Sequence, residues 1–179
     1  LVILVIMQTL RAMQMAMQNR LLEQKAFIDA HTGLPNKNAC NELLDKKDMI
    51  TDPTACIMFD LNNLKTVNDT MGHSAGDQLI MNFSKFLRSV IPEKDFVGRY
   101  GGDEFIAVIY HTSEAEIKEI LKSLSGEKDR LNSHENQIPI DYACGWALSS
   151  GNMSCTMQML LDDADAYMYK NKQLCKKYH

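Results

Sequence analysis

The first part of the chain carries apolar residues at helical spacing. After an unbroken apolar run over residues 1–7, apolar side chains recur every three or four positions: Ile3, Ile6, Leu10, Met13, Met17 and Leu21. No glycine or proline interrupts residues 1–25, and this alternating spacing is typical of a coiled-coil seam. The pattern predicts a long helix. We expect residues 1–27 to form a parallel dimeric stalk rather than a helix packed on its own domain.

The apolar run at residues 1–7 leaves two interpretations open. It is either the end of a transmembrane helix that starts before residue 1, or the apolar start of a signalling stalk. The run alone is too short to cross a bilayer, which needs about 20 apolar residues. The chain begins with Leu1 and not with a methionine, so we expect it to be a piece of a longer protein.

Beyond residue 27 the apolar spacing becomes mixed, with strand-like and helix-like segments in turn. A continuous apolar run at residues 55–59 predicts a strand that is buried on both faces. Residues 125–137 are polar and predict a loop with some irregular helix, because Gly126 can end the helix before it. Further strands are predicted at residues 95–98, 106–110 and 138–148, and helices at residues 37–47, 64–71, 75–90, 113–124 and 157–168. These elements predict a mixed α/β domain over residues 28–179.

Composition narrows the class of protein. The 179 residues suit one domain with an appendage, and 45% hydrophobic and 23% charged residues are typical of a globular fold. The net charge of −4 argues against a surface that coats nucleic acid. The five cysteines show no Cys-x-x-Cys spacing, which predicts reduced thiols of a cytosolic domain rather than a disulfide framework or a zinc site.

Acidic residues lie at two predicted strand ends. Gly101 and Gly102 separate two strand-like runs, and only glycine takes positive φ at both central positions of a tight hairpin turn without steric cost. We therefore expect this turn to hold Asp103 and Glu104 at its tip, while Asp60 ends the buried strand. Each acid alone is more often a solvated turn residue or a helix cap. Two neighbouring antiparallel strands that both deliver a carboxylate, however, form a minimal site for two Mg²⁺ ions.

Four motifs stand in an order that resembles a known family. They are Asp29-x-His31-Thr32-Gly33-Leu34-Pro35-Asn36, Asp60-Leu61-Asn62-Asn63-Leu64-Lys65-x-x-Asn68-Asp69-x-x-Gly72-His73-x-x-Gly76-Asp77, Gly101-Gly102-Asp103-Glu104-Phe105 and Ala164-Asp165-Ala166-x-Met168-Tyr169-x-x-Lys172. With them, residues 26–176 resemble GGDEF domains, the catalytic modules of diguanylate cyclases. The resemblance implies condensation of two GTP molecules into cyclic di-GMP with release of two pyrophosphates. It also implies the α+β palm fold of polymerases and class III nucleotide cyclases, with a mostly antiparallel sheet flanked by helices.

The resemblance assigns the chemistry of the site by position. It implies metal binding by the Asp60 side chain, the Leu61 carbonyl and Asp103, with two Mg²⁺ or Mn²⁺ ions per active site. Asp103 is also the expected base for the 3′-hydroxyl, while Glu104 binds metal, activates the hydroxyl or supports the hairpin. Lys65 is implied to neutralise charge that develops on the phosphates.

Base recognition is implied for a second group of residues. Asn68 and Asp77 match the guanine contacts of the family, with Asp77 accepting from N1–H and N2–H. His73 is carried over as a further substrate contact, and helix capping or core packing is its alternative. Lys172 and Lys176 lie four positions apart on a predicted helix, so both can face the phosphates; an ordinary basic helix end is the alternative.

The chain departs from the family pattern in places that affect regulation. The product-inhibition site of the family is an Arg-x-x-Asp, whereas the corresponding window here runs from Pro92 to Asp95 and contains no arginine. We therefore expect weak or no inhibition by cyclic di-GMP at that site. Asn171 and Cys175 replace the usual alanine and glycine, which affects the expected placement of Lys176.

The reaction implies partners and leaves competing functions. One domain binds one GTP, so activity requires a homodimer, brought together by the stalk under an upstream sensor. We expect a cytoplasmic domain, tethered to the inner face of a bacterial membrane through the region before residue 1, that binds no nucleic acid. Beside an active cyclase, two alternatives remain: a catalytically silent, GTP-responsive module and a cyclase that makes a cyclic mononucleotide.

Overall fold

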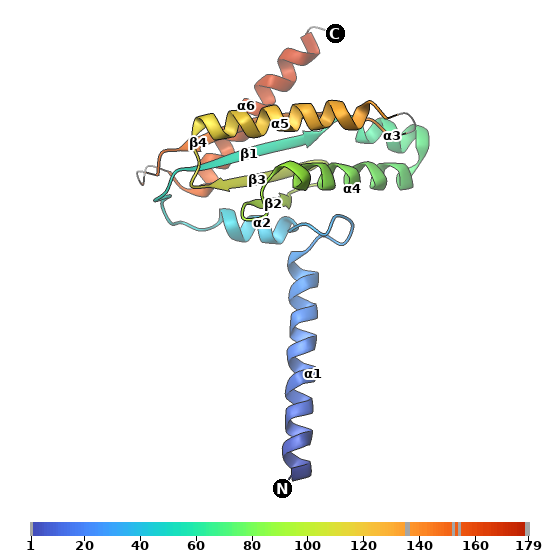
Figure 1. Cartoon of the computed structure of the whole chain (residues 1–179), viewed down its shortest axis with the longest axis vertical. Coiled ribbons are helices and arrows are strands. Elements are labelled where there is room, and N and C mark those ends of the chain that lie inside the picture. Colours follow the sequence, from blue (N-terminus) through green and yellow to red (C-terminus); the bar gives the residue numbers. More distant parts are fainter. Residues whose placement is uncertain (1, 135–136, 152, 154, 178–179) are drawn as a thin grey trace.

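A four-stranded antiparallel sheet with the strand order β2-β3-β1-β4 forms the centre of the domain (Figure 1). The computed structural model describes residues 2–134, 137–151, 153 and 155–177, without the side chains of residues 4, 23, 24 and 174–177. The strands are β1 (Thr54–Leu61), β2 (Phe96–Arg99), β3 (Glu104–Tyr110) and β4 (Tyr142–Ser149). The helices are α1 (Val2–Phe27), α2 (Lys37–Leu44), α3 (Leu64–Met71), α4 (His73–Val90), α5 (Glu114–Asn132) and α6 (Met157–Lys177).

Helices cover both faces of the sheet and bury β1 between them. Ala55, Ile57 and Phe59 belong to a core that includes α4 and α5, while Cys56 and Met58 pack in a second core with α2 and α6. All five side chains are at most 3% exposed. The predicted α+β fold, with a doubly covered antiparallel sheet, is therefore confirmed.

Local capping signals fix two of the helix starts. The Asn36 side chain accepts hydrogen bonds from the backbone of Asn38 and Ala39, so α2 begins where the sequence predicts; it ends at Leu44, three residues before the predicted end. Ser113 and Glu116 form a reciprocal capping box at the start of α5, which satisfies backbone N–H groups that have no partner within the helix.

The loop with irregular helix predicted at residues 125–137 is a regular helix up to residue 132, so the predicted stop at Gly126 is wrong. Helix α5 continues through Gly126 to Asn132. Its last turns are held by contacts that are distant in sequence: the Asn132 side chain exchanges two 2.8 Å hydrogen bonds with the backbone of Ile140. Because both backbone groups of Ile140 bond to Asn132, they do not pair with a strand. Strand β4 begins at Tyr142 rather than at the predicted residue 138.

Helix α1 projects from the domain as an isolated rod (Figure 1). The seam positions are solvent-exposed, for example 56% at Leu10 and 69% at Met13. The predicted helix is confirmed over residues 2–27, and its described seam side chains do not pack on its own domain. Among the described residues, no helix combines the length and the apolar character that a membrane crossing requires.

Candidate active site

The acidic residues of the two strand ends come together because β1 and β3 pair. Asp60 lies directly opposite Glu104 in the antiparallel register. The backbone N–H of Leu61 donates to the Asp103 carbonyl at 2.8 Å, which fixes the signature turn against the end of β1. Burial raises the pKa of Glu104, and the negative charges of Asp103 and Asp60 raise it further. The structure thus brings the three predicted acids into one electrostatic cluster.

The turn itself differs from the expected tight hairpin. Neither Gly101 nor Gly102 adopts positive φ. The connection is longer than a two-residue turn, because the N–H groups of Tyr100 and Gly101 both donate to the Glu104 carbonyl. A Cβ on Gly101 would lie 2.5 Å from Glu104 Oε2, whereas one on Gly102 would meet nothing within 4 Å. A side chain at Gly101 would therefore displace the Glu104 carboxylate, whereas the backbone angles of Gly101 do not call for glycine.

Helix α6 adds a cation to the acids. Lys172 Nζ lies 2.7 Å from Asp60 Oδ1, and the Asp60 side chain is only 16% exposed. Asn171 donates to the Cys144 carbonyl of β4 at 3.1 Å, which anchors this turn of α6 to the sheet. The side chain of Lys176 lies outside the described residues. Lys65 lies exposed in the first turn of α3, after Asp60 and Leu61 at the end of β1.

The donor set suits a hard divalent cation. Carboxylate and carbonyl oxygens, which Asp60, Asp103 and Leu61 offer, are the ligands that Mg²⁺ prefers. Within the described part of the chain, no group of three or more His, Cys, Asp or Glu side chains is arranged to hold an ion alone. The remaining ligands would have to come from substrate phosphates and water, as is usual for Mg²⁺ in phosphoryl-transfer sites.

The predicted base-binding residues lie on α3 and α4. Asn68 and Gly76 are in direct contact across the two helices, since a Cβ on Gly76 would collide with Asn68 Oδ1. Asp77, in the next position of α4, is half-exposed, and His73 is exposed in the first turn of the same helix. Asn68 thus lies against the residue that precedes Asp77 on α4, and their joint role in base binding stays a prediction.

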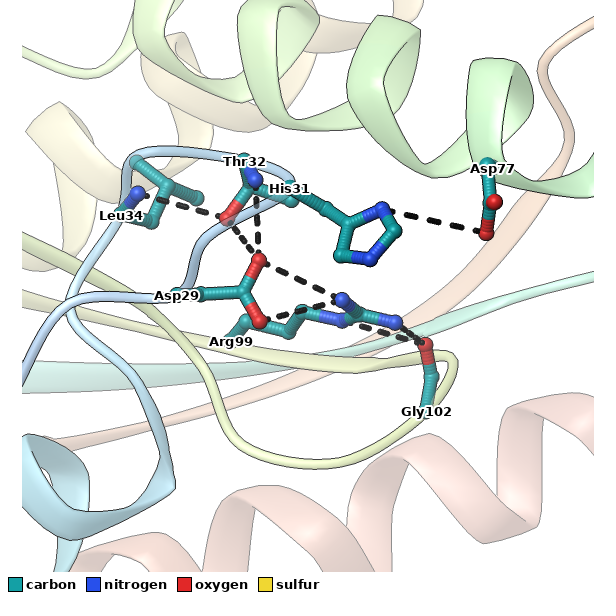
Figure 2. Close-up of polar contacts among 7 residues, drawn as sticks. All are labelled: Asp29, His31, Thr32, Leu34, Asp77, Arg99 and Gly102. Atoms are coloured by element: carbon teal, nitrogen blue, oxygen red, sulfur yellow. Dashed lines mark hydrogen bonds and ion pairs between the residues drawn. The ribbon is translucent and has the colours of Figure 1, made fainter. Parts of the chain in front are cut away.

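A turn at residues 29–33 faces these helices, and sequence reasoning gave its side chains no role. Figure 2 shows the His31 imidazole pointing toward Asp77, with Nδ1 3.9 Å from Oδ1. In the same view Asp29 binds Arg99 Nη1 at 3.1 Å, and Arg99 Nη2 donates to the Gly102 carbonyl at 2.9 Å. The turn thus faces the base-binding helix through His31, and Arg99 links it to the signature turn.

Asp29 is ionised in this arrangement. Burial raises the pKa of its carboxyl, but hydrogen bonds from Thr32 and the positive charge of Arg99 outweigh burial and leave the pKa below its ordinary value. The carboxylate accepts from the Thr32 N–H at 2.9 Å and from the Thr32 hydroxyl at 2.8 Å. The turn residue and the strand residue are 70 positions apart, so no local sequence signal could have revealed their pairing.

Comparison with known proteins identifies the family. The sequence model described as diguanylate cyclase, GGDEF domain, matches residues 26–177. The chain belongs to the GGDEF family. Its relatives include the diguanylate cyclase DgcP of Pseudomonas aeruginosa, 27% identical over 84% of this chain and 23% of that protein. Another is the cyclic di-GMP phosphodiesterase PdeR of Escherichia coli, 34% identical over 83% of this chain and 23% of that protein. The chain thus spans less than a quarter of the length of these relatives.

Solved GGDEF structures share the fold. The coiled coil and GGDEF domain of DgcB from Caulobacter crescentus, solved in complex with c-di-GMP, superposes with a TM-score of 0.76. At 21% identity over 93% of this chain and 91% of that one, the likeness concerns the fold alone, including a helix ahead of the domain. The GGDEF domain of TpbB (YfiN) from Pseudomonas aeruginosa is 28% identical, with a TM-score of 0.66 over 82% of this chain and 89% of that one.

Proposed function

We infer that this GGDEF domain is a diguanylate cyclase, which condenses two GTP molecules into cyclic di-GMP and releases two pyrophosphates. The observation that carries the proposal is the juxtaposition of Asp60, Asp103 and Glu104 at paired strand ends, with Lys172 beside them. Family membership supports it. Because relatives named as cyclic di-GMP phosphodiesterases also match this chain, the activity depends on the site residues rather than on the family name.

The acids of the signature turn are placed to take the proton of the attacking hydroxyl. In the proposed reaction the 3′-oxygen of one GTP forms a bond to the α-phosphorus of the other, and the bond to pyrophosphate breaks. The single 3′-hydroxyl proton passes to one carboxylate of this pair, Asp103 or Glu104, while the 3′-oxygen keeps the electrons for the new bond to phosphorus. Burial and its acidic neighbours raise the pKa of Glu104, and a carboxylate with a raised pKa is a stronger base when it is ionised.

The phosphates are held by cations from two elements. Lys65 on α3 and Lys172 on α6 neutralise the negative charge that develops on the phosphoryl oxygens, and Lys176 is a further candidate on the same helix. Asp60, Asp103 and the Leu61 carbonyl would hold Mg²⁺ or Mn²⁺, which supplies charge neutralisation at the phosphates when bound. Asn68 and Asp77 bind the base, and His73 is a further substrate contact.

Two domains must meet for the reaction, because each GTP attacks the other. We assign residues 1–27 to a stalk that dimerises and residues 28–179 to the catalytic domain. The exposed apolar seam of α1 supports this division. Joining two domains through a short linkage raises their effective concentration to the millimolar range, so an upstream sensor would act by changing how the domains meet.

Product analysis tests the proposal. The chain, with α1 fused to a strong parallel coiled coil to enforce dimerisation, is incubated with GTP and Mg²⁺, and the products are separated by chromatography. We expect cyclic di-GMP from GTP and no product from ATP. Asp103→Ala should abolish the product, whereas Asp69→Ala, an acid outside the proposed site and exposed on α3, should retain it.

The silent-module alternative has a distinct outcome in the same experiment. A forced dimer that binds GTP, measured by calorimetry, but forms no cyclic di-GMP would reject the cyclase and leave a GTP-responsive module. A cyclic mononucleotide as the product would reject both and indicate a different cyclase on the same fold.

A further inference from the structure

We propose that His31 is part of the base-binding site and contacts the edge of guanine that carries the 2-amino group. The inference rests on the proposed function, because it takes Asp77 as the residue that accepts hydrogen bonds from the base. It adds a residue from a different element, the turn that joins α1 to the domain.

The backbone around His31 is held firmly while its side chain stays accessible. The Asp29 carbonyl accepts from the Gly33 N–H at 2.9 Å, and the Asp29 N–H donates to the Leu34 carbonyl at 2.8 Å. The Asp29 side chain adds two hydrogen bonds to Thr32. The His31 side chain is 55% exposed. A rigid turn that presents an exposed imidazole provides a preorganised contact for a ligand.

The side chains of His31 and Asp77 face each other, but no hydrogen bond joins them. Their separation of 3.9 Å is too long for a hydrogen bond, which needs about 2.7–3.2 Å between the heavy atoms. Among the described residues, neither side chain has another hydrogen-bonding partner. Both therefore keep their bonding capacity for a group that enters beside them.

The 2-amino group of guanine fits this pair chemically. It carries two hydrogens: one can be donated to Asp77 together with N1–H, which leaves the second without a partner. A neutral imidazole has one nitrogen that accepts hydrogen bonds. His31 can accept the second hydrogen, so that turn and helix bind the same amino group from two elements.

The proposed contact would also link the stalk to substrate binding. The turn follows α1 directly, and Asn36, just beyond it, binds the end of α1: its N–H donates to the Phe27 carbonyl at 2.9 Å, and its side chain donates to the Ala26 carbonyl at 3.0 Å. A change at the base of the stalk would therefore reach His31 through a short bonded path. Affinity for GTP, besides the rate of the chemical step, becomes a quantity that the stalk can control.

The test compares GDP with IDP, which lacks the 2-amino group, by calorimetric titration of the full chain in Mg²⁺. These diphosphates share the base edges of GTP and ITP and are bound without turnover to pyrophosphate. We expect His31→Ala to weaken GDP binding about fivefold or more, the effect of one lost hydrogen bond, and to change IDP binding by less than about twofold. His31→Gln, which restores an acceptor, should recover most of the GDP affinity.

His111 provides a matched control. It forms a similar exposed pair with Asp52, again with 3.9 Å between Nδ1 and Oδ1, but it follows β3 on a different loop. His111→Ala should leave both affinities unchanged. A thermal melt of each variant checks that the fold is intact, so that a loss of GDP binding reports on the site.

Equal losses for GDP and IDP, or no loss for either, would overturn the role of His31. If that occurred while the forced dimer still made cyclic di-GMP, the proposed function would stand without it. If His31→Ala weakened GDP binding but not IDP binding, and the forced dimer made no product, the base contact would be supported and the proposed cyclase activity rejected. A wild-type chain that binds neither nucleotide would overturn both.

Discussion

At the scale of single residues, the pairing of Lys172 with Asp60 bears most directly on the proposed metal site. The two charged atoms lie 2.7 Å apart, and Asp60 is mostly buried. A divalent cation that binds the same carboxylate has to displace this ammonium group or share the carboxylate with it. Lys172 therefore opposes metal binding in the free protein, while its positive charge favours the phosphates of a bound nucleotide.

Lys172→Met separates these two effects. We expect Mn²⁺ alone to bind more tightly to the variant than to the wild type, because the competing cation is gone. Cyclic di-GMP formation should fall by about a hundredfold, since a charge that stabilises the transition state is lost. Paramagnetic resonance titration of Mn²⁺ measures the first effect. Lys170→Met serves as the control, because Lys170 lies over the Tyr167 ring rather than beside the acids; an equal gain in Mn²⁺ affinity there would contradict the explanation.

Asp29 gives a prediction about pH. Its pKa is lowered below 3.8 in the folded state by Thr32 and Arg99, against the opposing effect of burial. A lowered folded pKa means that the ionised form stabilises the fold above the unfolded pKa, and that this contribution is lost as pH falls through the folded pKa. Asp29→Asn should therefore flatten the decline of the unfolding free energy below about pH 4. Urea titrations from pH 5 to pH 3 measure the slope, and an unchanged slope would contradict this assignment.

At the scale of elements, two glycines have different effects on stability: one lies within a helix, and the other lies on a strand against which a helix packs. Gly126 lies within α5, and a Cβ there would meet nothing within 4 Å. Gly145 lies on β4 where α6 crosses it, and a Cβ there would collide with the backbone of Ala164 and Met168. The first glycine only adds backbone freedom, whereas the second permits the close approach of a helix to the sheet.

Alanine substitutions test this difference. Gly126→Ala should stabilise the protein by about 0.5–1 kcal/mol, because alanine favours the helix. Gly145→Ala should destabilise it by about 1–3 kcal/mol or more, because the packed backbone of α6 must shift. Chemical denaturation of both variants provides the measurement. A loss of stability in Gly126→Ala would show that α5 does not continue through this position in solution.

At the scale of the whole molecule, the exposed seam of α1 favours association of two chains. Leu10→Glu with Met17→Glu places charges in the seam and should shift the chain to monomers and reduce cyclase activity with it. The control, Gln8→Glu with Met15→Glu, adds the same charge outside the seam and should leave the dimer intact. Sedimentation equilibrium measures association. Fusion to a separate coiled coil should restore the activity of the seam variant; if it did not, the stalk would act by more than association.

Regulation by product is the second prediction at this scale. The window that holds the product-inhibition site in the family begins here with Pro92, and Asp95 is 3% exposed, with Oδ1 accepting from the Tyr110 N–H at 3.1 Å. The chain thus lacks the arginine, and the remaining acid faces inward. We expect added cyclic di-GMP to inhibit the forced dimer weakly at most. Steady-state rates over a range of product concentrations test this, and strong inhibition would require a product site built from other residues.

The sequence alone determined those features whose causes are local. The cap at Asn36, the capping box at Ser113 and the doubly buried strand β1 follow from neighbouring residues, because a cap or an apolar run acts over a few positions. The spacing of the four motifs was enough to identify the family. The same locality explains two wrong predictions. Local sequence predicts a helix stop at Gly126 and positive φ at Gly101 and Gly102, and the structure shows neither.

Tertiary structure decided what depends on residues far apart in the chain. Lys172 and Asp60 are separated by 112 positions, and Asp29 and Arg99 by 70. Contacts of this kind form only after strands pair and helices dock, so no local propensity contains them. The end of α5 and the start of β4 were decided likewise by the bonds between Asn132 and Ile140. His31 acquires its proposed role in the same way, because only the folded chain places the turn after the stalk opposite Asp77.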